Sequence, residues 1–230
     1  MITELENALV KNRSQFHPVV QFNPATEKLT RLNFSETNTE LSQEIIADTN
    51  LFSIYIDEQL KKNNAKYGIG GYNENRKLYK RSKLFDSDEP RSVHLGVDIW
   101  GPAGTPVYVP LGGMVHSFAY NNNFGDYGAT IILLHQLETE AFYTLYGHVS
   151  LADISKLSEG AYVTRGELLG HFGTPDENGN WPPHLHFQII QDIQLKEGDY
   201  PGVCKPSERG FYQANCPDAD LILNMMKYLH

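Results

Sequence analysis

The pattern of apolar and polar residues divides the chain near residue 85. Before this point the clearest signal is helical, at residues 40–63, where apolar residues recur four positions apart. Asp48 or Thr49 is suited to cap the N-terminus of this helix. We expect a supporting helix packed on the main domain. The apolar residues at this spacing are Phe52, Ile56 and Leu60.

After residue 92 the pattern becomes that of strands. The apolar runs are short, rich in Val, Ile, Leu and aromatic residues, and separated by Gly, Pro, Asn and Asp. We therefore expect a mainly β fold with short connections, followed by a C-terminal helix at residues 219–229. The predicted strands are 93–100, 106–109, 114–119, 130–135, 142–146, 168–172 and 185–190.

These patterns predict three segments. Residues 1–85 form an N-terminal extension with a helix packed on the core, residues 86–200 form the central domain, and residues 201–230 form a C-terminal tail and helix. The glycine-rich stretch at 68–71 lacks the glycine spacing of nucleotide-binding loops and precedes no apolar helix. We interpret this stretch as a loop.

Composition and charge narrow the class of protein. With 230 residues, 40% of them hydrophobic and 20% charged, the chain is long and apolar enough to bury a core. The formal net charge of -9 opposes binding to nucleic acid or to anionic membranes, so we expect neither as a partner. No apolar stretch approaches the roughly 18 residues of a membrane span. The sequence does not indicate an oligomeric state.

The N-terminal sequence and the number of cysteines both bear on the cellular compartment of the protein. The N-terminus lacks a basic region followed by an apolar one, so we expect a cytoplasmic protein. A periplasmic or extracellular location is the alternative if export takes another route or a signal has been removed. Cys204 and Cys216 are too few for a disulfide framework, and we expect reduced thiols, with a single bridge as the alternative.

Histidines provide the candidate chemistry. His94 and Asp98 stand four residues apart, and His184 and His186 stand two apart, which on a strand places both on one face. Catalytic zinc takes three nitrogen or oxygen ligands and leaves a fourth position for water. His94, Asp98 and one histidine of the pair supply this set for one zinc ion. The other, together with His148, could move protons or stabilise negative charge.

The other histidines have simpler interpretations. His116 and His171 lie within strand-like runs and are expected at the edge of the core. His135 ends a predicted strand and is either a core residue or one that supports the groove from behind the ligands.

Residues 94–190 contain six motifs in a fixed order: H-L-G-V-D-I, G-T-P-V-Y-V-P-L-G-G-M-V, Y-G-A-T-I-I-L-L-H, Y-T-L-Y-G-H-V-S, E-G-A-Y-V-T-R-G-E-L-L-G-H-F-G and P-H-L-H-F-Q-I. In these motifs the segment resembles the catalytic domain of the lysostaphin/LytM-type zinc metallopeptidases. This resemblance implies a largely antiparallel β domain, the duplicated hybrid motif or barrel-sandwich hybrid, with a narrow groove above the metal. It also implies zinc bound by His94, Asp98 and His186, with His148 and His184 as the catalytic histidines.

The implied function is that of a bacterial zinc metallo-endopeptidase that hydrolyses a peptide bond through a zinc-activated water. In the family the substrate is usually a peptide of bacterial peptidoglycan. The flanks F-H-P-V-V, Y-G-I-G-G-Y-N-E-N-R and C-P-D-A-D-L-I-L resemble segments around such a domain in long chains that also carry phosphotransferase-like and aminotransferase domains. A cytosolic amidase acting on a small amino-acid conjugate is therefore an alternative. A metal-containing module that binds peptide without cleaving it is a second one.

Overall fold

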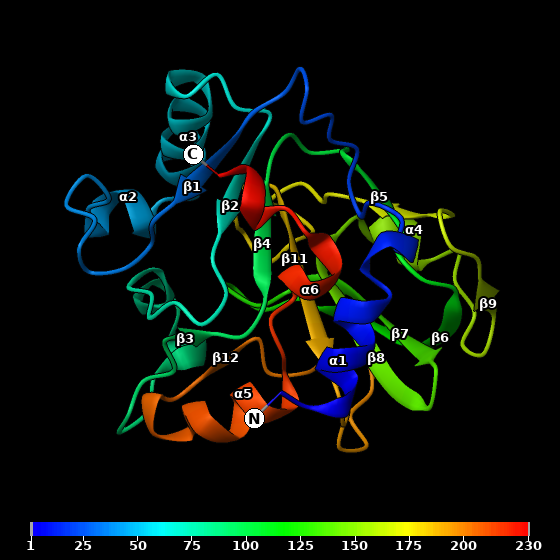
Figure 1. Cartoon of the computed structure of the whole chain (residues 1–230). Helices are drawn as coiled ribbons and strands as arrows, with labels where there is room; N and C mark the ends of the chain where they lie inside the picture. Colours follow the sequence, from blue (N-terminus) through cyan, green and yellow to red (C-terminus); the bar gives the residue numbers. More distant parts are fainter. Residues whose placement is uncertain (1, 230) are drawn as a thin grey trace.

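A computed structural model of the protein describes residues 2–229, so the outermost residues of the predicted N- and C-terminal segments lie outside it. The fold is mainly β, with helices at both ends of the chain (Figure 1). The strands are β1 Leu29–Leu32, β2 Tyr67–Gly70, β3 Val93–His94, β4 Val97–Trp100, β5 Pro106–Tyr108, β6 Gly113–Asn121, β7 Gly128–Leu137, β8 Glu140–Val149, β9 Tyr162–Val163, β10 Leu168–His171, β11 His184–Ile190 and β12 Val203–Cys204. The α-helices are α1 Glu4–Lys11, α2 Gln43–Ala47, α3 Thr49–Lys62, α4 Leu151–Ile154, α5 Arg209–Asn215 and α6 Asp220–Leu223. The 3-10 helices are η1 Arg13–Gln15, η2 Leu78–Arg81, η3 Lys83–Phe85, η4 Pro206–Glu208 and η5 Met226–Tyr228.

Eight strands form one large sheet in the order β1-β2-β4-β11-β8-β7-β6-β9. Among the described strands only β1 and β2 pair in parallel. β11 lies between β4 and β8, so that His186 is opposite Asp98 on one side and Gly147 on the other. The register of this strand therefore brings an imidazole beside a carboxylate that is distant in sequence.

All seven predicted strands are present, but the first is interrupted. Residues 93–100 divide into β3 and β4, with Leu95 and Gly96 between them. Gly96 passes so close to β11 that a Cβ atom there would lie 2.7 Å from the His186 ring and 2.7 Å from the Phe187 carbonyl oxygen. The missing side chain permits this approach, which sets His94 and Asp98 on either side of the break.

The interpretation of residues 68–71 as a loop is wrong, because Tyr67–Gly70 is strand β2 between β1 and β4. Its glycines suit a crowded strand rather than a turn. A Cβ atom on Gly68 would lie 2.4 Å from Leu32 Cδ1, and one on Gly70 would lie 2.6 Å from the Arg76 guanidinium. Glycine here allows close packing, which composition alone does not distinguish from a flexible loop.

The two predicted helices are both broken. Residues 40–63 contain α2 and α3, which meet at Asp48, where the side chain accepts hydrogen bonds from the Asn50 and Leu51 amides at 2.8 and 3.0 Å. A continuous helix at 219–229 is wrong, because Asn224 has a left-handed backbone (φ 53°) that ends α6 before η5. Helix α1, which the pattern did not indicate, begins with a capping box between Thr3 and Glu6.

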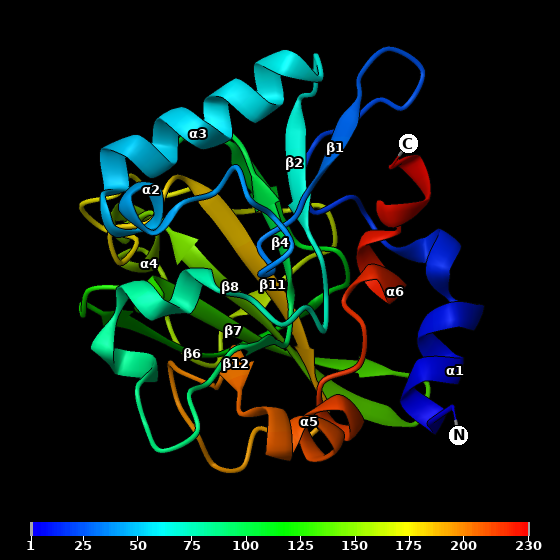
Figure 2. The same cartoon turned by 90° about the vertical axis from the view of Figure 1, so that its left-hand side faces the viewer.

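The helices cover the large sheet from two sides. In Figure 2, α3 runs along one side of the sheet, whereas α1 and α6 lie on the other, close to the two chain ends. Phe52 and Ile56 of α3 are buried against Trp100 and Trp181, so the helix packs on the part of the sheet that carries the candidate site.

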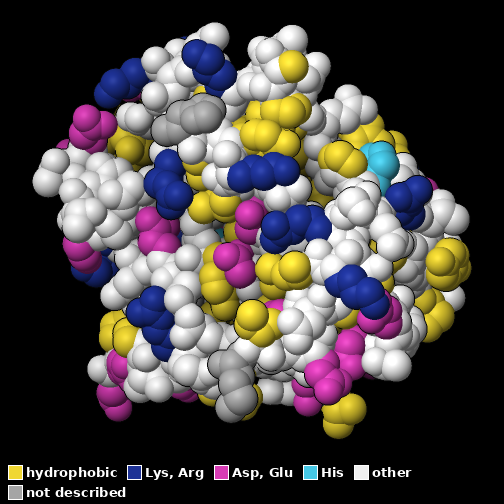
Figure 3. All heavy atoms as spheres, in the orientation of Figure 1, with side chains coloured by type: hydrophobic (Ala, Val, Ile, Leu, Met, Phe, Trp, Pro, Cys, Tyr) yellow, Lys and Arg dark blue, Asp and Glu magenta, His cyan; other side chains and the backbone are white. Residues whose placement is uncertain are grey.

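The distribution of surface charge and the character of the helices bear on the partners that the protein can have. On the face drawn in Figure 3, acidic and basic side chains are interspersed with apolar ones, so the net negative charge is not gathered into one patch there. Within residues 2–229, none of the helices combines the length and the apolar character that crossing a membrane requires.

Candidate metal centre

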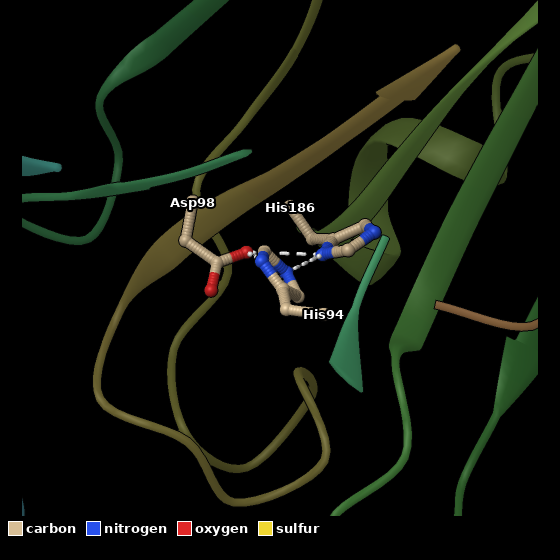
Figure 4. Close-up of side chains that lie close together, drawn as sticks. All are labelled: His94, Asp98 and His186. Carbon is tan, nitrogen blue, oxygen red and sulfur yellow. Dashed lines mark hydrogen bonds and ion pairs between the residues drawn. The ribbon is translucent and has the colours of Figure 1, made fainter. Parts of the chain in front are cut away.

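Three buried side chains from three strands point toward one another: His94 of β3, Asp98 of β4 and His186 of β11 (Figure 4). His94 Nε2 lies 2.9 Å from His186 Nδ1. Asp98 Oδ1 lies 3.1 Å from His94 Nε2 and 3.0 Å from His186 Nδ1. Two imidazole nitrogens and one carboxylate oxygen therefore share one small space.

The hydrogen bonds behind the rings assign their tautomers. His94 Nδ1 is 3.0 Å from the Gly71 carbonyl oxygen, which can only accept, so this nitrogen carries the proton. His186 Nε2 is 2.9 Å from Gln188 Oε1. The Gln188 amide nitrogen donates to the Pro201 carbonyl and to Cys216 Sγ, so its oxygen faces His186 and accepts. Both nitrogens that face Asp98 therefore present lone pairs.

This arrangement fits a metal ion. Three electron-pair donors lie about 3 Å apart with no proton between them, and this juxtaposition is unfavourable unless a cation binds them. Two imidazoles and one carboxylate are a ligand set that zinc accepts in catalytic sites. The hydrogen bonds from His94 to Gly71 and from His186 to Gln188 hold the rings in the orientation that ligation needs.

The pKa values of His94 and Asp98 favour the protonation states that bind a metal ion. Burial, helped by the nearby Arg76, lowers the pKa of His94 to about 3, so the ring is neutral at neutral pH. Burial raises the pKa of the Asp98 carboxyl, but its neighbours His94 and Arg76 outweigh this effect and hold the pKa well below its ordinary value. A neutral imidazole and an ionised carboxylate are the forms that bind a metal.

A second pair of histidines lies beside the cluster. The rings of His148, at the end of β8, and His184, at the start of β11, have centroids 4.1 Å apart. Each Nδ1 donates a hydrogen bond of 2.8 Å to a carbonyl oxygen, of Asn178 and of Pro182 respectively. Each Nε2 is therefore left with a lone pair. His184 also stacks on Trp100 at a centroid distance of 3.8 Å, which fixes its plane.

Burial keeps both of these rings neutral. It lowers the pKa of His184 to about 4, and it holds the pKa of His148 well below its ordinary value, with His184 adding to the effect. A neutral imidazole with a free Nε2 can accept a proton. The protonated ring would then give the proton up readily, because its low pKa makes it a strong acid.

The backbone of His148 is unusual. It has φ 65°, in the left-handed region that residues with a side chain seldom adopt. The β7–β8 register shifts between Ala129 and Ile131, where the partner residue changes from Val149 to Tyr146, so His148 lies in a β-bulge. A bulge redirects a side chain from the regular alternation of the strand. Here it accompanies the placement of an imidazole beside His184.

A cavity of about 260 Å³ opens over the two clusters. Asp98, His148, His184 and His186 line it, so four of the five predicted site residues face the same space. One wall comes from residues 76–91, in the predicted N-terminal extension and the start of the central domain, and another from residues 196–203. Six aromatic side chains also line the cavity: Tyr79, Phe85, Trp100, Tyr127, Trp181 and Tyr200.

Several residues near the site were not predicted. Gln188, which holds His186, follows His184 and His186 at the same two-residue spacing on β11, so its position on that face could have been inferred. Arg76 and the Gly71 carbonyl had no comparable signal, because they lie far along the chain from the ligands that they contact, Asp98 and His94 respectively. His135 hydrogen-bonds to Gly112 and Thr144 and does not line the cavity, which agrees with the core interpretation.

The fold and the site together define a β-sheet domain with a buried His-Asp-His cluster beside a histidine pair. Comparison with known proteins gives the family. The model of peptidase family M23 matches residues 92–197, and this part of the chain is therefore an M23 domain of the lysostaphin/LytM type. Strands β3 to β11 lie within the match, whereas α1 to α3 and β1 and β2 precede it.

Curated relatives match over part of their length. The protein named DD-carboxypeptidase/endopeptidase Mpg, from Neisseria meningitidis serogroup B and from Neisseria gonorrhoeae, is 29% identical over 96 residues, which are 42% of this chain and 20% of the relative. The matched part thus spans about a fifth of the length of these relatives.

Solved structures are similar as well. The catalytic domain of the antimicrobial peptidase lysostaphin from Staphylococcus simulans has 22% sequence identity and a TM-score of 0.40, covering 70% of this chain and 97% of that one. A zinc containing peptidase from Vibrio cholerae has 27% identity and a TM-score of 0.34, covering 43% of this chain and 27% of that one.

Proposed function

We propose that the protein is a zinc-dependent hydrolase of peptide or related amide bonds, with one zinc ion held by His94, Asp98 and His186. The observation that carries this proposal is the convergence of two imidazole lone pairs and a carboxylate oxygen within about 3 Å of one another. When bound, zinc supplies a Lewis acid and lowers the pKa of a water toward about 7, which makes a nucleophile available at neutral pH.

His148 and His184 would move the protons of the reaction. Their Nε2 atoms are the unprotonated ones, and both side chains line the cavity that opens over Asp98 and His186. One ring takes the proton that the attacking water loses. Protonated, it stabilises negative charge that develops on the amide carbonyl oxygen, and it can return the proton to the leaving amine. Either ring has the geometry for each role.

A peptide is the substrate class that the family favours, and a peptide of bacterial peptidoglycan is the first candidate. The relatives from Neisseria are named DD-carboxypeptidase/endopeptidase, although the similarity covers only a fifth of their length. The aromatic walls of the cavity suit the apolar faces of peptide units, and Asp98, His148, His184 and His186 line the same cavity. This supports hydrolysis rather than binding alone.

A second candidate is an amidase for a small amino-acid conjugate. It is favoured by the size of the cavity, because about 260 Å³ lies at the small end of ligand sites. It is also favoured by the wall that residues 76–91 form, since the whole of that segment precedes the part of the chain that matches the family. A short substrate would fill such a space more completely than a long cross-linked peptide.

The proposed activity is tested by incubating the protein with purified peptidoglycan and with a panel of short peptides and aminoacyl amides. We expect hydrolysis of at least one class, its loss after treatment with a chelator, and its return when zinc is added back. Soluble fragments from peptidoglycan would favour the endopeptidase, whereas cleavage confined to the short compounds would favour the amidase. Hydrolysis that a chelator leaves unchanged would contradict a metal-dependent reaction.

A further inference from the structure

Two of the three candidate ligands are held by a segment that precedes the M23 match. Residues 71–76 lie ahead of the matched range 92–197. The Gly71 carbonyl oxygen accepts the hydrogen bond from His94 Nδ1 at 3.0 Å. An Arg76 guanidinium nitrogen donates to Asp98 Oδ2 at 2.5 Å. The metal centre therefore depends on contacts from outside the domain that defines the family.

The backbone fixes this segment against the strand that carries His94. The Asn73 amide donates to the His94 carbonyl at 2.8 Å, and the His94 amide donates to the Glu74 carbonyl at 3.0 Å. The Arg76 amide donates to the Ser92 carbonyl at 2.8 Å. These bonds form a short ladder beside β3, so that Arg76 is placed by main-chain pairing and not by its side chain alone.

The Arg76 side chain is almost completely buried, with 1% of its surface exposed. A buried charge needs partners, and this guanidinium has two: Glu74 Oε2 at 2.8 Å and Asp98 Oδ2 at 2.5 Å. The Tyr79 hydroxyl is a further neighbour at 3.3 Å. Burial lowers the pKa of Arg76, but Tyr79, Asp98 and Glu74 outweigh this effect and keep the group charged. The result is an alternating row of charges, Glu74, Arg76 and Asp98.

We propose that Arg76 is a positioning residue of the metal centre, a role that rests on the proposed zinc site. Because the guanidinium occupies Asp98 Oδ2, only Oδ1 faces His94 Nε2 and His186 Nδ1. The planar guanidinium bonds Glu74 through Nε and Asp98 through a terminal nitrogen, so it holds Oδ2 in a fixed direction, which a point charge would do less well. Glu74 balances the cation, so that its positive charge does not repel a metal ion nearby.

Removing this contact has a defined consequence. With Oδ2 released, the Asp98 carboxylate can rotate and offer either or both oxygens. The site would lose its prepared geometry and would bind zinc more weakly, by roughly 10- to 100-fold, as is usual when a partner of a metal ligand is removed. The coordination number of a bound ion would also become less uniform.

The experiment measures zinc affinity by competition with a chromophoric chelator, and the visible absorption of the Co²⁺-substituted protein, which reports coordination geometry. Arg76→Gln removes the charge, Arg76→Lys keeps it without the two-sided contact, and Glu74→Gln removes the balancing charge. Arg81→Gln is the control, because Arg81 lies in the same region, packs over Trp181, and contacts no candidate ligand.

We expect Arg76→Gln to weaken zinc binding by roughly 10- to 100-fold and to alter the Co²⁺ spectrum. Arg76→Lys should lie between Arg76→Gln and the native protein. Glu74→Gln should weaken zinc binding several-fold, and Arg81→Gln should leave affinity and spectrum unchanged. If Arg76→Gln does not fold, Arg76→Lys and Glu74→Gln decide the question by the same two readouts.

Two results would overturn this role for Arg76. One is native zinc affinity and a native Co²⁺ spectrum in the folded Arg76 variants. The other is an equal loss in Arg81→Gln, which would indicate general destabilisation. Failure of the native protein to bind zinc would instead contradict the proposed function itself, so the two failures are distinguishable.

Discussion

At the scale of single residues, the candidate site combines ordinary side chains with unusual local constraints. His148 has a left-handed backbone, and His184 is held between Trp100 and a hydrogen bond to the Pro182 carbonyl. The left-handed backbone of His148 opposes stability locally and persists because the surrounding structure holds it in place. Here they place two neutral imidazoles 4.1 Å apart beside the His-Asp-His cluster.

The backbone of His148 leads to a prediction about two truncations at one position. Both His148→Ala and His148→Gly remove the imidazole, so both should lose turnover while retaining zinc. They should differ in stability, because glycine adopts φ 65° without strain and alanine does not. We expect the glycine variant to be the more stable by about 1 kcal/mol, the reverse of the usual order. Urea denaturation of the two proteins measures this difference.

Since both variants lose the same hydrogen bond to the Asn178 carbonyl, that loss cancels in the comparison. A more stable alanine variant would mean that His148 is not in the left-handed region in solution.

At the scale of elements, the site depends on where β3, β4 and β11 approach one another. β11 supplies His184, His186 and Gln188 from one face, and the break between β3 and β4 brings His94 and Asp98 opposite His186. The break is possible because Gly96 has no side chain where it passes the His186 ring. The geometry of the cluster is thus a property of strand packing as much as of the ligands.

Gly96→Ala should therefore damage both the fold and the metal site. The added methyl group would lie 2.7 Å from the His186 ring and from the Phe187 carbonyl oxygen, and backbone atoms cannot move aside easily. We expect a loss of about 1–3 kcal/mol in the free energy of unfolding, together with reduced zinc content. Thermal denaturation and metal analysis provide the two readouts.

Gly210→Ala is the matched control, because a Cβ at Gly210 in α5 would have no atom within 4 Å beyond its chain neighbours and the backbone of its own helix. It should keep native stability or gain slightly from the better helix propensity of alanine. Equal behaviour of the two alanine variants would contradict a close contact at Gly96.

The elements also indicate what could be predicted from the sequence. The strands follow from local spacing, and so do His94, Asp98 and one histidine of the H-x-H pair as candidate ligands. The family resemblance adds the choice of His186 over His184. β2 was not predicted, because its glycines serve close packing that involves Leu32 and Arg76. The break at Asn224 was not predicted either, because a single residue in the left-handed region interrupts an otherwise helical pattern. The contact between Arg76 and Asp98 joins residues 22 positions apart, so no local sequence pattern predicts it.

At the scale of the whole molecule, the cavity is built from all three predicted segments of the chain. Arg76 and Tyr79 come from the N-terminal extension, the histidines come from the central domain, and Gly202 and Val203 come from the C-terminal segment. The segment boundaries themselves remain a prediction. Because residues from all three segments line one cavity, the site forms only when these segments fold together.

The fold should be sensitive to acid through buried neutral histidines such as His135. Burial lowers the pKa of His135 from 6.5 to about 4, so the unfolded chain binds its proton more readily than the folded protein does. The free energy of unfolding should therefore fall as the pH is lowered from about 7 to about 4, with this residue contributing roughly 3 kcal/mol over that range.

Comparing native protein with His135→Gln by denaturant unfolding at several pH values isolates this contribution. We expect a shallower pH dependence in the variant, because glutamine does not titrate. Identical slopes would mean that His135 is not buried in its neutral form. His135 does not line the cavity, so the comparison is independent of the candidate metal site.

The central claim is that His94, Asp98 and His186 hold a zinc ion which His148 and His184 do not ligate. Metal analysis of the purified native protein, His186→Ala and His184→Ala tests it most directly. We predict one zinc per chain in the native protein, little or none in His186→Ala, and a full complement in His184→Ala, which should nevertheless have lost turnover. Zinc retained in His186→Ala and lost from His184→Ala would reverse the ligand assignment and contradict the account.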